Sequence, residues 1–111
     1  MCSSDLFKYD KILLATGGTA RRPPVSGVDL QNVFVLRNYK DLTNIQKSTS
    51  EGVKDIVVIG ASFIGLETAN TLKKSLKDAN VTVVDVSSLP LERVFGSKIG
   101  EHVKKIGRAH V

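Results

Sequence analysis

The sequence predicts an α/β fold built on a parallel β-sheet, and three features of its second half support this prediction. Residues 55–60 contain a continuous apolar run, Ile56 to Ile59, that suits a strand covered on both faces. A helix is expected to follow, from about Phe63 to Lys77. A second apolar strand, Val81 to Asp85, completes a strand–helix–strand unit of about 30 residues, the size of a parallel crossover.

The predicted helix is supported by the spacing of its apolar residues, which recur at intervals of three to five and so share one face. That stripe consists of Ile64, Ala69, Leu72 and Leu76. Basic residues near the end of the helix complement its dipole, and they are Lys73, Lys74 and Lys77. A further helix is expected to start near Ser97. Two strands alone cannot cover both faces of a sheet, so four apolar residues are expected to stay partly exposed: Ile56, Val58, Val81 and Val83.

The first half of the chain predicts less regular structure. A strand is expected over Lys11 to Ala15, followed by a turn at the two glycines of residues 17 and 18. The adjacent prolines of residues 23 and 24 exclude a regular helix there. A second short strand is expected over Val33 to Leu36.

A helix is expected after Asn38, because this residue can cap a helix and Asp41 lies three positions on, as in a partial capping box. Leu42 and Ile45 form its apolar stripe. The polar segment from Ser48 to Lys54 contains glycine and is the predicted domain boundary.

Composition excludes several classes of protein. The formal net charge of +5 is ordinary for a solvated surface, and a modest positive field also suits a dinucleotide. Aromatic residues are few and are not interleaved with basic ones, so no nucleic-acid stacking surface is predicted. No apolar run has the ~18–20 residues of a membrane span. The single cysteine excludes an internal disulfide framework and a cysteine-based metal site. We expect an intracellular location, cytoplasmic or mitochondrial.

The most informative motif is the run from Gly60 to Gly65, with the sequence Gly-Ala-Ser-Phe-Ile-Gly. It follows a buried strand and opens a helix, where a dinucleotide fingerprint belongs. The first glycine permits a tight turn and the last permits close packing of helix on strand. A diphosphate would then lie at the helix N-terminus. Ser62 replaces the usual middle glycine, so its side chain either crowds the diphosphate or donates a hydrogen bond to it.

Asp85 strengthens this interpretation, because it ends the second strand 25 residues after Gly60. A carboxylate at this position can accept the ribose hydroxyls of NAD and repel the 2′-phosphate of NADP. The alternative from these residues alone is a pair of structural glycines and an exposed aspartate.

Four segments in the same order resemble the pyridine nucleotide-disulfide oxidoreductase family of flavoproteins. Leu13 to Gly17 is similar to its second FAD motif, a strand followed by Ala-Thr-Gly, and Val35 to Arg37 resembles a Leu-Arg segment whose Arg contacts FAD. Val57 to Glu67 resembles the NAD fingerprint and the glutamate after it, and Leu89 to Val94 resembles the segment after the second strand of the NAD domain. The resemblance is strongest to the branch of ferredoxin reductases and apoptosis-inducing-factor-like proteins, and within it to the type-3 apoptosis-inducing factors.

The resemblance implies a partial Rossmann-type flavoprotein with two dinucleotide-binding domains: the end of the FAD-binding domain over residues 7–50 and the first half of the NAD(P)-binding domain over residues 51–105. It implies that FAD contacts Thr16, Gly17 and Arg37. It also implies a set of NAD(P)H-binding residues, namely Gly60, Ala61, Ser62, Phe63, Ile64, Gly65, Glu67 and Asp85. Glu67 would lie near the nicotinamide, and Arg93 is either close to the adenosine or a surface residue.

The activity implied is hydride transfer from NADH to FAD, with electrons passing to a ferredoxin or Rieske-type iron–sulfur centre or to a quinone. No side chain is expected to act as acid, base or nucleophile, since the cofactors carry the bond chemistry. No metal ligand and no nucleic-acid partner are expected. The alternatives are a non-catalytic dinucleotide-binding or apoptotic effector module and a dehydrogenase that uses NAD alone.

Both ends of the chain resemble a short-read sequencing adapter. Residues 106–111, Ile-Gly-Arg-Ala-His-Val, match one reading frame of such an oligonucleotide, and residues 1–6 match its reverse complement. We therefore expect residues 7–105 to be an internal fragment of a longer enzyme that is inactive by itself, and residues 1–6 and 106–111 to be adapter-derived.

Overall fold

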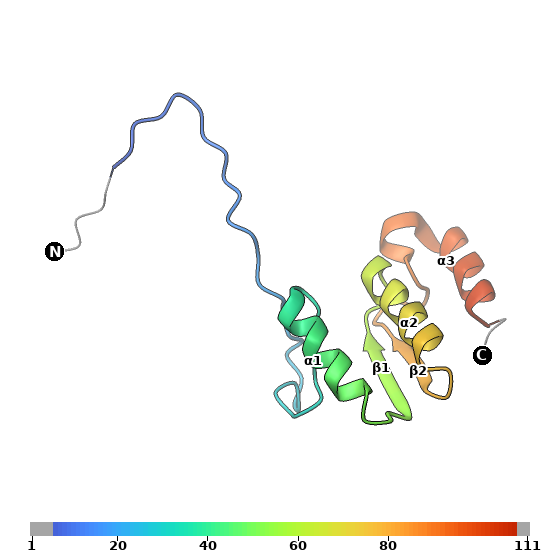
Figure 1. Cartoon of the computed structure of the whole chain (residues 1–111). Coiled ribbons are helices and arrows are strands. Elements are labelled where there is room, and N and C mark those ends of the chain that lie inside the picture. Colours follow the sequence, from blue (N-terminus) through green and yellow to red (C-terminus); the bar gives the residue numbers. More distant parts are fainter. Residues whose placement is uncertain (1–5, 109–111) are drawn as a thin grey trace. The chain divides into compact units, whose positions relative to one another are not determined.

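The computed structural model describes residues 6–108 and divides into two compact units at the bond between Gln46 and Lys47. The elements are α1 (Tyr39–Thr49), β1 (Asp55–Ile59), α2 (Phe63–Ser75), β2 (Asn80–Val84) and α3 (Glu92–Arg108), as Figure 1 shows. Among these described residues, no helix is long and apolar enough to cross a bilayer.

The second unit contains the predicted strand–helix–strand arrangement. β1 and β2 pair in parallel, from Asp55 opposite Asn80 to Ile59 opposite Val84. α2 connects the two strands and contacts both of them (Figure 1). The Gly60 N–H donates to the Val84 carbonyl at 2.7 Å and so extends the ladder by one bond beyond the strands. The predicted α/β fold class is confirmed.

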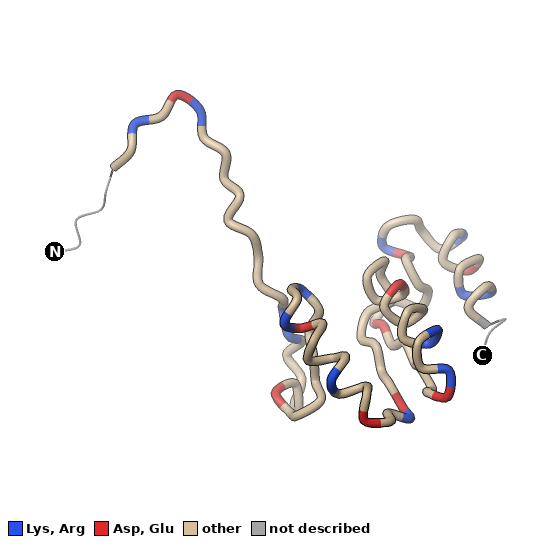
Figure 2. The backbone as a smooth tube through the Cα atoms, viewed as in Figure 1, with Lys and Arg blue, Asp and Glu red and all other residues tan. Residues whose placement is uncertain are grey.

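α2 packs on the sheet through a face that is shifted slightly from the predicted stripe. Ala69 is buried, whereas Ile64 is 65% exposed and is not part of the packed face. Gly65 and Leu66 take its place, and both are half-buried. The lysines behave as predicted at the helix end, because Lys73 Nζ donates to the carbonyls of residues 77 and 79 at 3.0 and 2.9 Å. Figure 2 shows the basic residues in this part of α2.

The two faces of the sheet differ in exposure. The strand residues beneath α2 are half-buried, and they are Ile56, Val58, Val81 and Val83. They remain partly exposed, as expected. The opposite face is more exposed, with Val57 at 62%, Ile59 at 68% and Val84 at 43%. Apolar strands of a parallel sheet are normally covered on both faces. The described part of the chain covers one.

The two strands predicted in the first unit are not formed. Residues 11–15 and 33–36 have no strand assignment. Leu13 is 89% exposed and Leu14 is 78% exposed. A strand needs a neighbour for its backbone N–H and C=O groups, and within the described residues neither segment has a ladder partner. Both strand predictions are therefore wrong for this chain.

The helix predicted after Asn38 is confirmed together with its cap. The Asp41 N–H donates to Asn38 Oδ1 at 3.0 Å, and the Asn38 N–H donates to Asp41 Oδ2 at 3.1 Å. This reciprocal pair is a complete capping box. α1 continues to Thr49, so the first residues of the expected linker at Ser48 are helical instead. Its stripe residues are incompletely covered, with Leu42 39% exposed.

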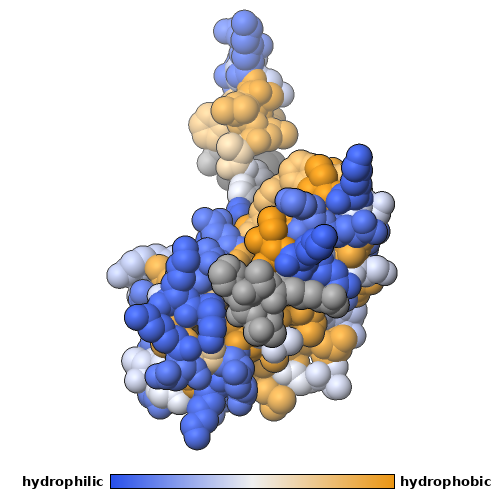
Figure 3. All heavy atoms as spheres, turned by 90° about the vertical axis from the view of Figure 1, so that its right-hand side faces the viewer, coloured by the Kyte–Doolittle hydropathy of each residue, from blue (hydrophilic) through white to orange (hydrophobic). Residues whose placement is uncertain are grey.

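α3 begins earlier than predicted. Residues 92–95 form a first turn, and Gly96 then breaks the helix with φ 79° and ψ 173°. The second part starts at the predicted Ser97. Apolar side chains of α3 remain partly exposed, with Val94 at 58% and Phe95 at 47%. Figure 3 shows hydrophobic side chains between hydrophilic ones on this side of the molecule. Of the adapter-like ends, residues 1–5 and 109–111 lie outside the described residues.

Candidate functional site

The turn between β1 and α2 can be built only with glycine at its two ends. Gly60 has φ +108°, a conformation that L side chains rarely adopt. A Cβ on Gly65 would lie 1.8 Å from the Gly60 carbonyl oxygen, far inside any possible contact. The first glycine therefore turns the chain, and the second lets α2 approach the turn. These are the two structural roles that the fingerprint interpretation assigns to them.

The backbone N–H groups of the turn divide into two sets. Those of Gly60 and Ala61 are already bonded, to the Val84 carbonyl at 2.7 Å and to Asp85 Oδ2 at 2.6 Å. The first bond of α2 is donated by Leu66 to the Ser62 carbonyl at 2.9 Å. In the part of the chain that the structure describes, the N–H groups of residues 62–65 have no acceptor. Such free groups at a helix N-terminus suit a diphosphate.

Ser62 occupies the N-cap position of α2, with φ −90° and ψ −176°. A serine at this position commonly accepts a bond from the backbone of the first turn. Here its hydroxyl makes no capping bond, so it is free to donate to an anion. The open N–H groups, the uncapped hydroxyl and the absence of a Cβ at Gly65 together fit a dinucleotide diphosphate.

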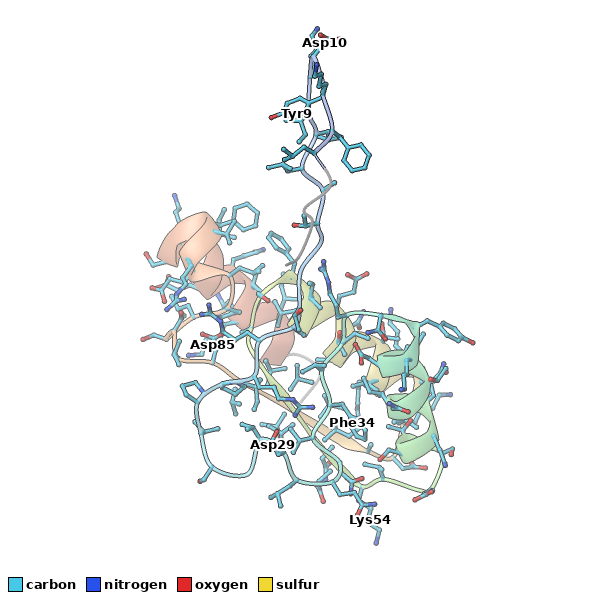
Figure 4. All side chains as sticks on the ribbon, turned by 90° about the vertical axis from the view of Figure 1, so that its left-hand side faces the viewer. Tyr9, Asp10, Asp29, Phe34, Lys54 and Asp85 are labelled. Carbon is cyan, nitrogen blue, oxygen red and sulfur yellow. The ribbon has the colours of Figure 1, made fainter. Side chains whose placement is uncertain are left out.

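Asp85 lies directly after β2, as Figure 4 shows. Its Oδ2 accepts the Ala61 N–H at 2.6 Å, and its Oδ1 accepts the Ser87 N–H at 2.7 Å. These bonds, that from Ser87 first, lower the pKa of the Asp85 carboxyl below its usual value, and Arg93 adds a smaller effect of the same sign. A carboxylate has about four lone-pair sites. The exposed Asp85 therefore keeps acceptor capacity for ribose hydroxyls.

Residues after β2 complete the surroundings of the turn, and the sequence interpretation did not identify most of them. The Leu91 N–H donates to the Ala61 carbonyl at 3.0 Å. Phe95 meets Phe63 edge to face, with ring centroids 5.5 Å apart. No short motif marks Ser87, Leu91 or Phe95. The resemblance of Leu89 to Val94 to a family segment was the one available signal.

The remaining predicted NAD-binding residues lie on α2. Phe63 is 52% exposed and Ile64 is 65% exposed at the start of the helix. Glu67 is exposed in the next turn. The fingerprint, Glu67 and Asp85 thus all lie in the second unit.

The predicted FAD-contacting residues lie in the first unit. Thr16 and Gly17 are exposed, and Gly17 has φ +74°. The structure brings Arg37 to this turn, since a Cβ on Gly18 would lie 3.9 Å from Arg37 Nη2. The Arg37 backbone is held by its N–H bond to Asp41 Oδ2 at 2.9 Å. The Ala-Thr-Gly turn and the arginine are therefore neighbours, as a shared ligand would require.

Comparison with known proteins decides the family. Residues 3–110 match the family described as pyridine nucleotide-disulphide oxidoreductase. The chain belongs to the pyridine nucleotide-disulphide oxidoreductase family. The ferredoxin–NAD(+) reductase component of the biphenyl dioxygenase system of Paraburkholderia xenovorans is 35% identical over 92 residues, 83% of this chain and 22% of that protein.

Two further relatives show the breadth of the similarity. Rhodocoxin reductase of Rhodococcus erythropolis is 39% identical over 90 residues, 81% of this chain and 20% of that protein. Apoptosis-inducing factor 3 of Mus musculus is 32% identical over 99 residues, 89% of this chain and 16% of that protein. The chain spans about a fifth of the length of these relatives. The predicted branch of ferredoxin reductases and apoptosis-inducing-factor-like proteins is confirmed.

Proposed function

We propose that this chain is part of an FAD-dependent oxidoreductase that takes hydride from NADH and passes electrons to an acceptor protein. The observation that carries the proposal is the turn from Gly60 to Gly65, with open N–H groups at the start of α2 and Asp85 beside it. Family membership supports the same function.

Within this proposal the residues of the second unit bind NADH. The N–H groups of residues 62–65 and the Ser62 hydroxyl hold the diphosphate. The free lone pairs of Asp85 accept the ribose hydroxyls of the adenosine. Gly60 and Ala61 shape the turn and leave phosphate binding to the following amides, since their own N–H groups are bonded within the protein. Glu67, one helical turn further along α2, is proposed to lie near the nicotinamide.

FAD is proposed to contact the first unit through Thr16, Gly17 and Arg37. The guanidinium is positively charged and close to the glycine turn, so it suits an anionic or carbonyl oxygen of the flavin nucleotide. When both cofactors are bound, the nicotinamide supplies the hydride and the flavin accepts it. The protein residues orient the two cofactors and need not exchange protons themselves.

NADH is proposed as the preferred donor. The Ser87 and Ala61 backbone N–H groups donate to Asp85 and lower the pKa of its carboxyl, which favours the ionised form. A fixed negative charge beside the ribose repels the 2′-phosphate of NADPH while accepting the free hydroxyl of NADH.

The acceptor is proposed to be a small electron-transfer protein or domain, such as a ferredoxin or a Rieske-type centre, with a quinone as the alternative. Relatives named as reductases of a ferredoxin, of rhodocoxin and of rubredoxin support this class. An intracellular location, cytoplasmic or mitochondrial, is part of the proposal because NADH is an intracellular cofactor.

The test uses the longer protein that carries this segment. We expect a flavin absorbance spectrum and oxidation of NADH in the presence of an artificial electron acceptor. The similarity to apoptosis-inducing factor 3 favours a non-catalytic effector module as the second candidate. That candidate predicts NADH binding without turnover. A dehydrogenase that uses NAD alone predicts no flavin spectrum.

We also propose that residues 7–105 are the part of this chain that belongs to the longer protein. Sequencing the gene across both junctions provides the test. Different codons outside this range are expected, and genomic codons for Ile-Gly-Arg-Ala-His-Val after Lys105 would contradict the proposal.

A further inference from the structure

The backbone of Ala61 is bonded on both sides by the segment that follows β2. Its N–H donates to Asp85 Oδ2 at 2.6 Å. Its carbonyl accepts the Leu91 N–H at 3.0 Å. We call the set of Ala61, Asp85 and Leu91 the Ala61 clamp. It connects the turn before α2 to a segment 24 to 30 residues further along the chain.

The Asp85 side of the clamp is fixed by a second bond. Asp85 Oδ1 accepts the Ser87 N–H at 2.7 Å, which closes a turn of the Asx type and sets the direction of the carboxylate. Each carboxylate oxygen therefore holds a backbone N–H from a different segment.

The Leu91 side is fixed by unusual backbone geometry. Leu91 has φ +57°, in the left-handed region that bulky residues rarely adopt. Its carbonyl accepts the N–H groups of Val94 and Phe95, both at 3.0 Å, so the same residue starts α3. Residues are kept in such conformations only where the surroundings determine them strongly.

α3 secures the far end of the segment. A Cβ on Gly100 would lie 2.8 Å from the Leu89 Cβ and 2.9 Å from the Pro90 carbonyl oxygen, so helix and segment are in close contact. The edge-to-face pair of Phe63 and Phe95 links the start of α3 directly to the start of α2. The clamp is thus supported by packed elements on both sides of the turn.

We propose that Asp85 is a positioning residue for the diphosphate-binding turn as well as a ribose ligand. The Ala61 clamp holds the Ala61 peptide so that the N–H groups of residues 62–65 are oriented before the cofactor arrives. This inference rests on the proposed function, because it takes the diphosphate to bind at those groups. It predicts that a change at Asp85 weakens binding of a ligand that has no ribose.

Inorganic pyrophosphate separates the two roles of Asp85. If Asp85 acts only on the ribose, removing its negative charge leaves pyrophosphate binding unchanged or strengthens it, because repulsion is reduced. If Asp85 positions the turn, the same change weakens pyrophosphate binding, because the amides lose their preset orientation. Only the positioning role predicts weaker pyrophosphate binding.

The experiment compares Asp85→Ala with the unchanged protein in the longer FAD-containing chain. Asp78→Asn is the matched control, an exposed aspartate at the opposite end of α2. The rate of amide hydrogen exchange at Ala61, measured without any ligand, shows whether the bond to Asp85 is intact. The exchange rates of the ladder amides of β1 and β2 show whether the unit remains folded. The affinity of the turn for pyrophosphate is measured by its competition with NADH.

We expect Asp85→Ala to accelerate exchange at Ala61 by roughly tenfold or more and to weaken pyrophosphate binding by a similar factor, since a bond to a charged acceptor is lost. Asp78→Asn should change neither. Equal or tighter pyrophosphate binding, or an unchanged Ala61 exchange rate with an intact ladder, would overturn the clamp. Failure of the unchanged protein to bind NADH would instead count against the proposed function, and the exchange result at Ala61 would still decide the clamp.

Discussion

Two apolar runs of the same length behave differently in this molecule. Residues 55–59 form β1, and each of them has a partner in β2. Residues 11–15 are equally apolar at their centre but form no strand, and Leu13 is 89% exposed. Residues 56–59 are all β-branched and therefore favour a strand more than Leu13, Leu14 and Ala15 do. The runs also differ in pairing, because residues 55–59 have a partner strand among the described residues and residues 11–15 have none.

The comparison shows that the strand–helix–strand unit supplies its own strand pairing, whereas the described residues of the first unit form no β-ladder. The second unit contains its own partner strand, its own covering helix and two glycines that bring helix and turn together. Even there the described residues cover one face of the sheet and leave Val57 and Ile59 largely exposed on the other. The following predictions test how far the second unit folds and binds its cofactor with its own residues.

The largest effect is expected from removing the remainder of the longer protein. Residues 7–105 expressed alone should retain no FAD and show no cooperative thermal unfolding. Losing ~400 Å² of apolar burial on the open sheet face and the unpaired first unit would cost about 10 kcal/mol, which is comparable to the whole stability of a domain. Stoichiometric FAD with a cooperative transition would show that residues 7–105 fold and bind FAD without further segments.

The next effect is expected at the closest contact of the second unit. Gly65→Ala places a Cβ 1.8 Å from the Gly60 carbonyl oxygen. α2 must then move away from the turn, and we expect a loss of about 3 kcal/mol of stability together with NADH binding. Thr71→Ala, at an exposed position of the same helix, should be nearly neutral. Thermal unfolding of the longer protein compares the two variants, and equal melting temperatures would contradict the packing role of Gly65.

A smaller effect is expected on cofactor choice. Asp85→Ala removes the carboxylate that we propose to accept the ribose hydroxyls and to oppose a 2′-phosphate. The preference for NADH over NADPH, measured as the ratio of kcat/KM values, should fall by roughly ten- to a hundredfold. An unchanged ratio would show that Asp85 does not select the nucleotide.

The smallest effect is expected in the pH dependence of the bond between Asp85 and the Ala61 N–H. Bonds from Ser87 and then from Ala61 lower the pKa of Asp85 below the ordinary 3.8. The stabilisation from the ionised carboxylate is therefore complete above pH 3.8 and is lost as the pH falls through the lower value of the folded state. Amide exchange at Ala61, followed through the acid range, should keep its protection down to that lower value. Loss of protection already above pH 3.8 would contradict the two bonds.

The sequence predicted those features that depend on neighbouring residues. The capping box of Asn38 and Asp41, the parallel pair of strands and the glycine turn were all available from spacing and composition. The predicted strands at residues 11–15 and 33–36 failed because a strand is stabilised by its partner, which spacing within one run does not reveal.

The bonds around Ala61 were beyond sequence reasoning for a different reason. A backbone N–H or carbonyl carries no residue identity, so nothing marks Leu91 as the donor to Ala61. The left-handed φ of Leu91 is also unexpected for its residue type. The position of Asp85 after β2 predicts a ribose ligand, but the bonds that Asp85 accepts from the protein backbone are visible only in three dimensions.

The most direct test of the central claim is an anaerobic titration of the longer protein with NADH, followed by flavin absorbance. The account predicts that the oxidised flavin band is bleached by about one equivalent of NADH, and that NADPH is less effective at the same concentration. A protein that binds flavin but stays oxidised with excess NADH, or that contains no flavin, would contradict the assignment of this chain to an NADH-dependent flavoprotein.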